Sequence, residues 1–138
     1  MNLAMRNLYI VLFISILAAI SGCSSLSEIT KLEGEGKKNI YQKNIDVIWP
    51  IVILSINDLG IPIIETNKES GYVLAKRGVS VGSYGENIAI FVKKQNDSVT
   101  SVEIISKRRL ATTVFATDWT DSFFMMLENR LKIQPNKN

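Results

Sequence analysis

The sequence contains no histidine and a single cysteine among its 138 residues. Without histidine, the chain cannot build a Ser-His-Asp triad, a Cys-His pair or a histidine-ligated metal site. With one cysteine, it cannot form an intramolecular disulfide bond. Prolines number only 3, and no long run of charges of one sign occurs. These absences exclude several common classes of hydrolase and metal site, and no other metal site is expected.

The charge balance is mildly basic, with 16 Lys and Arg against 13 Asp and Glu, a net charge of +3. We see no basic stripe interleaved with aromatic residues, so nucleic acid is not an expected partner. The densest basic cluster is Lys107-Arg108-Arg109. It could contact anionic groups such as lipid headgroups, lipopolysaccharide phosphates or peptidoglycan carboxylates. A solvated strand end is the alternative, and it is favoured because basic triplets are common on protein surfaces.

The amino-terminal segment carries much of the hydrophobicity of the chain, which is 46% overall. Met1–Arg6 is short and positively charged, and Leu8–Ile20 supplies 13 residues whose only polar side chains are Tyr9 and Ser15. A helix needs about 20 residues to cross a bilayer, so this stretch is too short for a permanent span. Its length and flanks are typical of a secretory signal peptide.

Ile20-Ser21-Gly22-Cys23 follows this stretch and resembles the lipobox of bacterial lipoproteins. The resemblance implies cleavage by signal peptidase II between Gly22 and Cys23. It also implies a diacylglycerol on the Cys23 thiol and an N-acyl chain (palmitate, for example) on the new terminus, with no other cofactor. The alternative is an ordinary free thiol. Ser24 and Ser25 follow the cysteine. In enterobacterial lipoproteins, an aspartate at this place resembles a signal for retention in the inner membrane. Its absence here implies the outer membrane, with the domain in the periplasm.

Four segments are expected along the chain. Residues 1–22 form the signal peptide, and residues 23–37 form an acylated flexible tether with Gly34-Glu35-Gly36 as its flexible point. Residues 38–133 form a single α+β periplasmic domain, and residues 134–138 form a disordered tail.

The first half of the domain is predicted to begin with a strand over residues 38–43, with Ile40 facing inward and Tyr41 facing away. A helix is predicted over Val47–Leu59, with Asn44 or Asp46 as its N-cap, Pro50 near its first turn and Gly60 ending it. The helix is apolar nearly all round. It is therefore either packed on more than one side or exposes a patch for a partner.

The second half is predicted to be mainly strands, over residues 61–66, 71–77, 86–94 and 99–107. Residues 110–116 fit either a sixth edge strand or an extended loop. A last helix is predicted from Thr117 or Asp118 to about Leu131, because Phe123, Phe124, Leu127 and Leu131 recur at helical spacing.

This order predicts an α+β fold, with an antiparallel sheet of four to six strands and two helices packed on one face. The order β-α-β-β-β-β-α, together with the lipobox, resembles helix-grip-like domains, including those of the BamC outer-membrane assembly lipoproteins. The resemblance covers about residues 37–131 and implies a role in the cell envelope.

Candidate sites beyond Cys23 are few. Glycines punctuate residues 77–85, but a strand follows them, which favours a hairpin tip over a phosphate loop. Asp118 and Asp121 share a helix face, and the positive end of the helix dipole explains them without catalysis. Trp49, Ile53 and Tyr84 are the residues we expect on an interaction surface, although core packing is the commoner role of such aromatic residues.

The sequence therefore predicts a non-enzymatic envelope lipoprotein that acts as an interaction or scaffold module, in outer-membrane assembly or maintenance. The expected partners are the membrane, through the lipid anchor, and an envelope protein that the sequence does not identify. Homo-oligomerisation stays open because of the apolar helix. The alternative function is a periplasmic carrier or sensor that binds a hydrophobic ligand between the sheet and the C-terminal helix.

Overall fold

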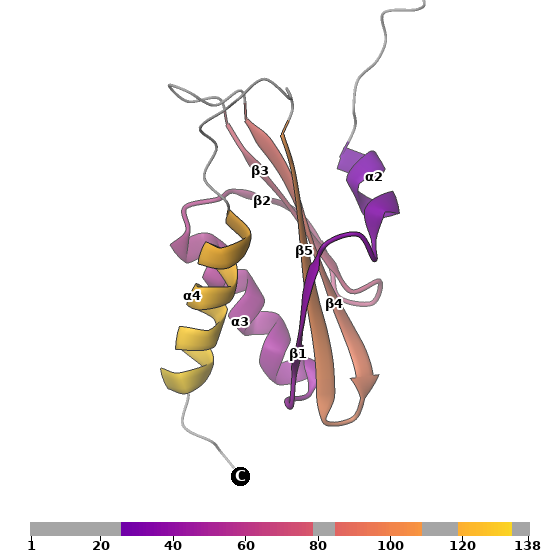
Figure 1. Cartoon of the computed structure of the whole chain (residues 1–138), viewed down its shortest axis with the longest axis vertical. Helices are drawn as coiled ribbons and strands as arrows, with labels where there is room; N and C mark the ends of the chain where they lie inside the picture. Colours follow the sequence, from indigo (N-terminus) through magenta and orange to yellow (C-terminus); the bar gives the residue numbers. More distant parts are fainter. Residues whose placement is uncertain (1–25, 79–84, 109–118, 134–138) are drawn as a thin grey trace, which may run out of the picture.

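The computed structural model describes residues 26–78, 85–108 and 119–133. These residues form an α+β fold, as expected, with one five-stranded antiparallel sheet and two longer helices on one face (Figure 1). The elements in chain order are α2 (Leu26–Ile29), η1 (Thr30–Leu32), β1 (Lys37–Tyr41), α3 (Ile45–Asp58), β2 (Ile63–Asn67), β3 (Tyr72–Arg77), β4 (Glu86–Asn96), β5 (Val99–Arg108) and α4 (Trp119–Ile133).

The sheet has the order β1-β5-β4-β3-β2, and every neighbouring pair is antiparallel. The expected alternation in β4 and β5 is confirmed, since Ile88, Ile90, Val92, Val102 and Ile104 all enter the main core under the helices. The expected strand over residues 110–116 lies outside the described residues.

The main core fills the space between the sheet and the two helices. From the helices it receives Ile48, Ile51, Val52, Ile56, Phe123, Phe124 and Leu127, all buried. Helix α3 packs against both the sheet and α4. This double contact explains why a helix on the surface of a small domain is apolar nearly all round.

Helix α3 begins two residues earlier than expected. Its N-cap is Asn44, whose Oδ1 accepts a hydrogen bond from the Val47 backbone N–H at 3.0 Å. Gly60 follows its C-terminus with φ of 66°, as expected of a glycine in that position. The earlier start leaves Pro50 inside the helix rather than near its first turn, so the expected placement of this proline was wrong.

The orientation of β1 was also predicted wrongly. Ile40 lies on the outer face with 63% of its surface exposed, whereas Tyr41 packs against the main core. The register explains this, because Ile40 pairs with Ser101 on the face away from the helices, and Tyr41 pairs with Thr100 on the helix face. A side chain follows the face that its partner residue occupies.

The second face of the sheet carries a smaller apolar cluster. Here Ile29, only 2% exposed, packs with Leu74, Ala89, Phe91 and Ile105. Residues 26–36 therefore fold back onto the sheet (Figure 1). The expectation of a flexible tether through residue 37 was wrong for this segment, which we call the N-terminal strap (residues 26–36).

Candidate functional site

The expected interaction residues on α3 are only partly available. Trp49 and Ile53 are half-buried and pack against the main core, and Tyr84 lies outside the described residues. The large hydrophobic side chain that α3 exposes is instead Leu54, which is 41% exposed. Sequence reasoning missed Leu54 because residues 51–54 are all apolar and the polar residue beside it, Ser55, is itself buried, so the pattern did not mark an outward side.

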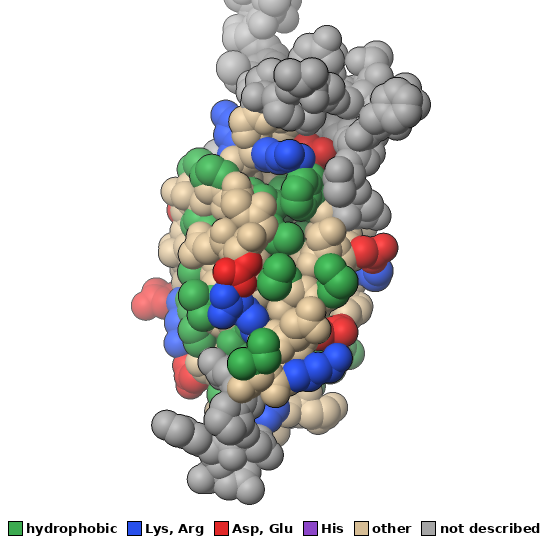
Figure 2. Space-filling view, turned by 90° about the vertical axis from the view of Figure 1, so that its left-hand side faces the viewer, with side chains coloured by type: hydrophobic (Ala, Val, Ile, Leu, Met, Phe, Trp, Pro, Cys, Tyr) green, Lys and Arg blue, Asp and Glu red, His purple; other side chains and the backbone are tan. Residues whose placement is uncertain are grey.

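An open groove of about 250 Å³ lies between α3 and α4. Its lining residues are Ile51, Leu54, Asp58, Met126, Asn129, Arg130 and Ile133. Ile133 is 77% exposed at the end of α4. Figure 2 shows this helix face, where hydrophobic side chains lie at the surface among charged ones. Such a mixture of exposed apolar and charged side chains is typical of a surface that contacts another protein.

One ion pair joins the two helices at this groove. The Arg130 guanidinium donates a hydrogen bond to the Asp58 carboxylate. This hydrogen bond holds the pKa of Asp58 below its usual range. The pair links the end of α3 to α4, and both of its residues line the groove.

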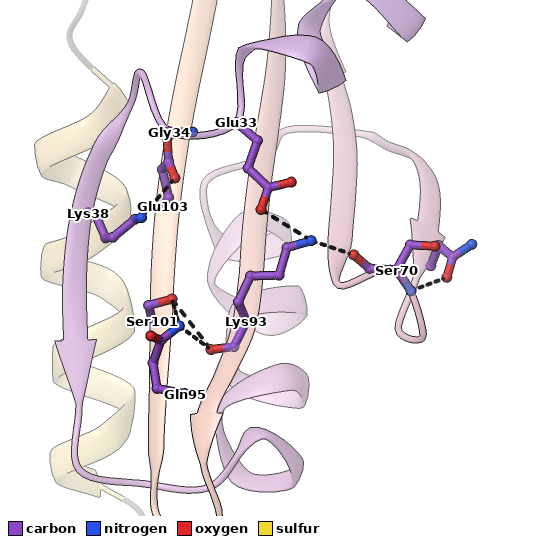
Figure 3. Close-up of polar contacts among 9 residues, drawn as sticks. Glu33, Gly34, Lys38, Ser70, Lys93, Gln95, Ser101 and Glu103 are labelled. Atoms are coloured by element: carbon purple, nitrogen blue, oxygen red, sulfur yellow. Dashed lines mark hydrogen bonds and ion pairs between the residues drawn. The ribbon is translucent and has the colours of Figure 1, made fainter.

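On the opposite face of the sheet, Glu103 holds the N-terminal strap (Figure 3). Its side chain is 2% exposed, and one oxygen accepts hydrogen bonds from the backbone N–H groups of Gly34, at 2.8 Å, and Gly36, at 2.7 Å. The Lys38 ammonium lies 3.6 Å from its other oxygen. Hydrogen bonds to a buried carboxylate are stronger than neutral ones, so this contact is the main polar link between strap and sheet.

A lysine on β4 adds a second link to the strap. The Lys93 ammonium lies 3.2 Å from the Glu33 carboxylate and donates a hydrogen bond to the Ser70 carbonyl at 2.8 Å (Figure 3). These contacts tie the strap to β4 and to the β2–β3 turn. The sequence of residues 33–36 does not indicate this attachment, because alternating glutamate and glycine is also typical of a flexible linker.

The end of the sheet where β3 and β5 finish carries several basic residues. Lys76 and Lys107 both pair with Asn87, so they flank it in one row on the second face. Lys107 is exposed, Arg108 ends β5, and Arg109 lies outside the described residues.

At the same end, on the helix face, the Arg77 guanidinium lies 4.5 Å from the centre of the Trp119 ring. Sequence reasoning found Lys107-Arg108-Arg109 but missed that Lys76 lies in the same row as Lys107. The sequence did carry a signal, because Lys76-Arg77 and Lys107-Arg108 each end a strand.

Two carboxylates, Glu103 and Glu86, are buried among the described residues. Glu103 is occupied by the strap, as described above. Glu86 is 2% exposed, and its carboxylate accepts a hydrogen bond from the Ser106 hydroxyl at 3.4 Å. Asp121 forms an ion pair with Lys37, and Asp118 lies outside the described residues. Across residues 26–78, 85–108 and 119–133, no three Asp, Glu or Cys side chains gather as metal ligands.

The lipobox residues, including Gly22 and Cys23, lie outside the described residues. Within the part that is described, no helix is long and apolar enough to cross a membrane.

Comparison with known proteins gives little to place beside this geometry. No protein-family model matches the chain, and no curated protein matches it. Among solved structures, one similar chain is the adenylate sensor from AMP-activated protein kinase, crystallised with the ribonucleotide ZMP. The identity is 8%, the match covers 70% of this chain and 95% of that chain, and the TM-score is 0.47. At this level of likeness we draw no inference about function from it.

Proposed function

We propose that this protein is a bacterial envelope lipoprotein anchored through Cys23. The proposal rests on one observation above all: a charged start, a 13-residue apolar stretch and Ile20-Ser21-Gly22-Cys23 follow one another in the order of a lipoprotein signal. Acyl chains bind a bilayer by about 0.8 kcal/mol per buried CH₂, so two or three chains suffice for stable anchoring. The serines after Cys23 favour the outer membrane, with the domain in the periplasm.

We assign the folded domain a non-enzymatic role as an interaction or scaffold module. Glu103, a buried carboxylate, has a structural partner in the strap. The ion pairs Lys68–Asp46 and Lys94–Asp97 lie near each other but are exposed, and neither lines the α3–α4 groove. Acid–base catalysis needs titratable groups that converge in a cleft. The order β-α-β-β-β-β-α supports the resemblance to helix-grip-like domains of outer-membrane assembly lipoproteins.

The groove between α3 and α4 is the surface we assign to an envelope protein partner. Leu54 and Ile133 supply exposed apolar area, and the Asp58–Arg130 pair supplies fixed polar groups between them. An apolar patch with a polar component is the usual composition of a protein interface.

The carrier function is disfavoured by the packing under the helices. Phe123 and Leu127 on α4 are fully buried in the main core, which also contains Ile90 and Ile104 of the sheet, so side chains fill the space that a hydrophobic ligand would need. The open groove is smaller than the roughly 300–1,000 Å³ typical of small-molecule sites.

The proposal is tested by labelling cells with radioactive palmitate. Wild-type protein is expected to carry label and to fractionate with membranes, whereas Cys23→Ser is expected to do neither. A Cys23→Ser variant that still carries label would contradict the anchor.

A photo-crosslinking residue at Leu54 tests the partner surface, with the same residue at Lys68 as the control position. Adducts to another envelope protein from Leu54 alone are expected. Adducts at twice the mass of the chain would identify a homo-oligomer instead, and equal adducts from both positions would contradict the assigned surface.

A further inference from the structure

Lys76 and Lys107 form a basic row on the second face of the sheet, one on each side of Asn87. The next row on the same face is Leu74, Ala89 and Ile105, which Ile29 of α2 covers. Adjacent rows on one face lie two residues apart, or about 7 Å. The basic row therefore lies directly beside the strap, on the face where the strap packs.

The length of the connecting chain limits how far the proposed anchor at Cys23 can lie from the strap. Only Ser24 and Ser25 separate Cys23 from Leu26, the first residue of α2. Three Cα–Cα steps of 3.8 Å limit the distance between Cys23 and Leu26 to about 11 Å. Since Glu103 and Lys93 attach the strap to the sheet, the domain cannot move far from a lipid surface that holds Cys23.

The charges of the sheet are compensated differently at its two ends. At the end with the β2–β3 and β4–β5 turns, Lys68 pairs with Asp46, and Lys94 pairs with Asp97. At the end where β3 and β5 finish, neither Lys76 nor Lys107 has a carboxylate partner among the described residues. Glu86 at this end is buried on the helix face, so on the second face the positive charges of Lys76 and Lys107 stay unpaired among the described residues, whereas Lys68 and Lys94 at the far end are paired.

We propose that Lys76 and Lys107 contact the headgroups of anionic phospholipids and fix the orientation of the domain on the membrane. This inference rests on the proposed lipid anchor at Cys23. The anchor keeps the domain at the bilayer, and the two lysines turn the end of β3 and β5 toward it. Each basic residue near an anionic surface contributes about 1 kcal/mol, equivalent to about five-fold in binding.

This orientation places the two tryptophans at different depths. Trp119 begins α4 and lies against Arg77, next to the basic end. Trp49 lies near the start of α3, and α3 starts at the end of the sheet that carries the β4–β5 turn (Figure 1). There the Thr100 hydroxyl donates a hydrogen bond to the Lys43 carbonyl, just before α3. The α3–α4 groove then stands beside the membrane rather than against it, accessible to a partner.

The test uses acylated full-length protein reconstituted in vesicles of phosphatidylcholine alone or mixed with phosphatidylglycerol. A nitroxide attached to the lipid headgroup quenches nearby tryptophan fluorescence. In the Trp49→Phe variant, which keeps Trp119, quenching is expected to increase with phosphatidylglycerol and to fall as salt is added. The double variant K76Q/K107Q is expected to lose this increase. The double variant K68Q/K94Q, with the same change in charge at the far end, is expected to retain it.

Three outcomes are decisive. If the quenching of Trp119 does not change with the phosphatidylglycerol content while the protein still floats with neutral vesicles, this inference is overturned. The proposed lipid anchor is then unaffected. Protein that fails to float with neutral vesicles would overturn the anchor, and the orientation with it. Equal losses in K76Q/K107Q and K68Q/K94Q would also overturn the inference. Hydrogen exchange of the unaltered protein gives a second readout, with protection expected at the ends of β3 and β5 on anionic vesicles only.

Discussion

Glu103 on β5 accepts a hydrogen bond from the backbone N–H of Gly36 at 2.7 Å, across a separation of 67 residues in the chain. The same glycine lies so close to β5 that a Cβ built on it would come within 2.4 Å of the Ile104 carbonyl oxygen. The contact therefore requires both a carboxylate on the strand and a residue without a side chain on the strap. It converts a segment that looks like a linker into part of the fold.

Replacing Glu103 is expected to destabilise the domain, and more so with alanine than with glutamine. Glu103→Ala leaves the N–H groups of Gly34 and Gly36 without their acceptor and is expected to cost about 2–4 kcal/mol in the free energy of unfolding. Glu103→Gln keeps an acceptor oxygen without the charge and is expected to cost about half as much. Denaturant unfolding measures both values. Unchanged amide exchange at Gly34 and Gly36 in Glu103→Ala would contradict the role of this carboxylate.

Gly36→Ala is expected to displace the strap from β5, because the new methyl group would overlap backbone atoms that cannot rotate away. Overpacking of this kind costs about 1–3 kcal/mol. Gly78→Ala is the matched control, since a Cβ at that exposed position has no atom within 4 Å and should change stability by less than about 0.5 kcal/mol. Similar losses in the two variants would show that close approach to Ile104 is not the cause.

Much of the fold could be predicted from the sequence, because the alternation in β4 and β5 and the helical spacing of Phe123 and Leu127 depend only on local periodicity. The face of β1 could not be predicted in this way. Alternation separates Ile40 from Tyr41, but only the register with β5 decides which of them meets the helices. That register is a non-local property of the sheet.

The candidate surfaces show the same division. The lipobox and Lys107 could be found from the sequence because they depend on neighbouring residues. The strap attachment joins Glu103 to Gly34, and the basic row joins Lys107 to Lys76, across large separations in the chain. Composition alone suggested flexibility for Gly34-Glu35-Gly36, since glycine is common both in linkers and where backbones approach closely.

Pro50→Ala is expected to stabilise the domain. Pro50 lies inside α3, where it cannot donate a backbone hydrogen bond and its ring opposes the carbonyl four residues before it. Proline in a helix interior costs up to about 3 kcal/mol relative to alanine, reduced somewhat by the greater freedom of the unfolded alanine chain. Thermal unfolding measures the change, and a lower midpoint in the variant would contradict this reading of the helix.

The Asp58–Arg130 pair is expected to make stability depend on pH in the acid range. The hydrogen bond from Arg130 lowers the folded pKa of Asp58 below its unfolded value. Its contribution is therefore fully present above the unfolded pKa, about 3.9, and is lost as the pH falls through the lower folded pKa.

The difference in stability between wild type and Arg130→Gln should consequently be present at neutral pH and shrink below about pH 4. A carboxylate titration by NMR should place the pKa of Asp58 closer to its ordinary value in the variant. A stability difference that persists unchanged into strong acid would assign the effect of Arg130 to packing instead.

The central claim, that Cys23 is the acylated amino terminus of the mature protein, is tested most directly by the intact mass of the protein purified from its native membrane. The account predicts a chain that begins at Cys23, with the added mass of a diacylglycerol and an N-linked acyl chain. A mass that includes residues 1–22, or one that begins elsewhere with an unmodified thiol, would contradict it.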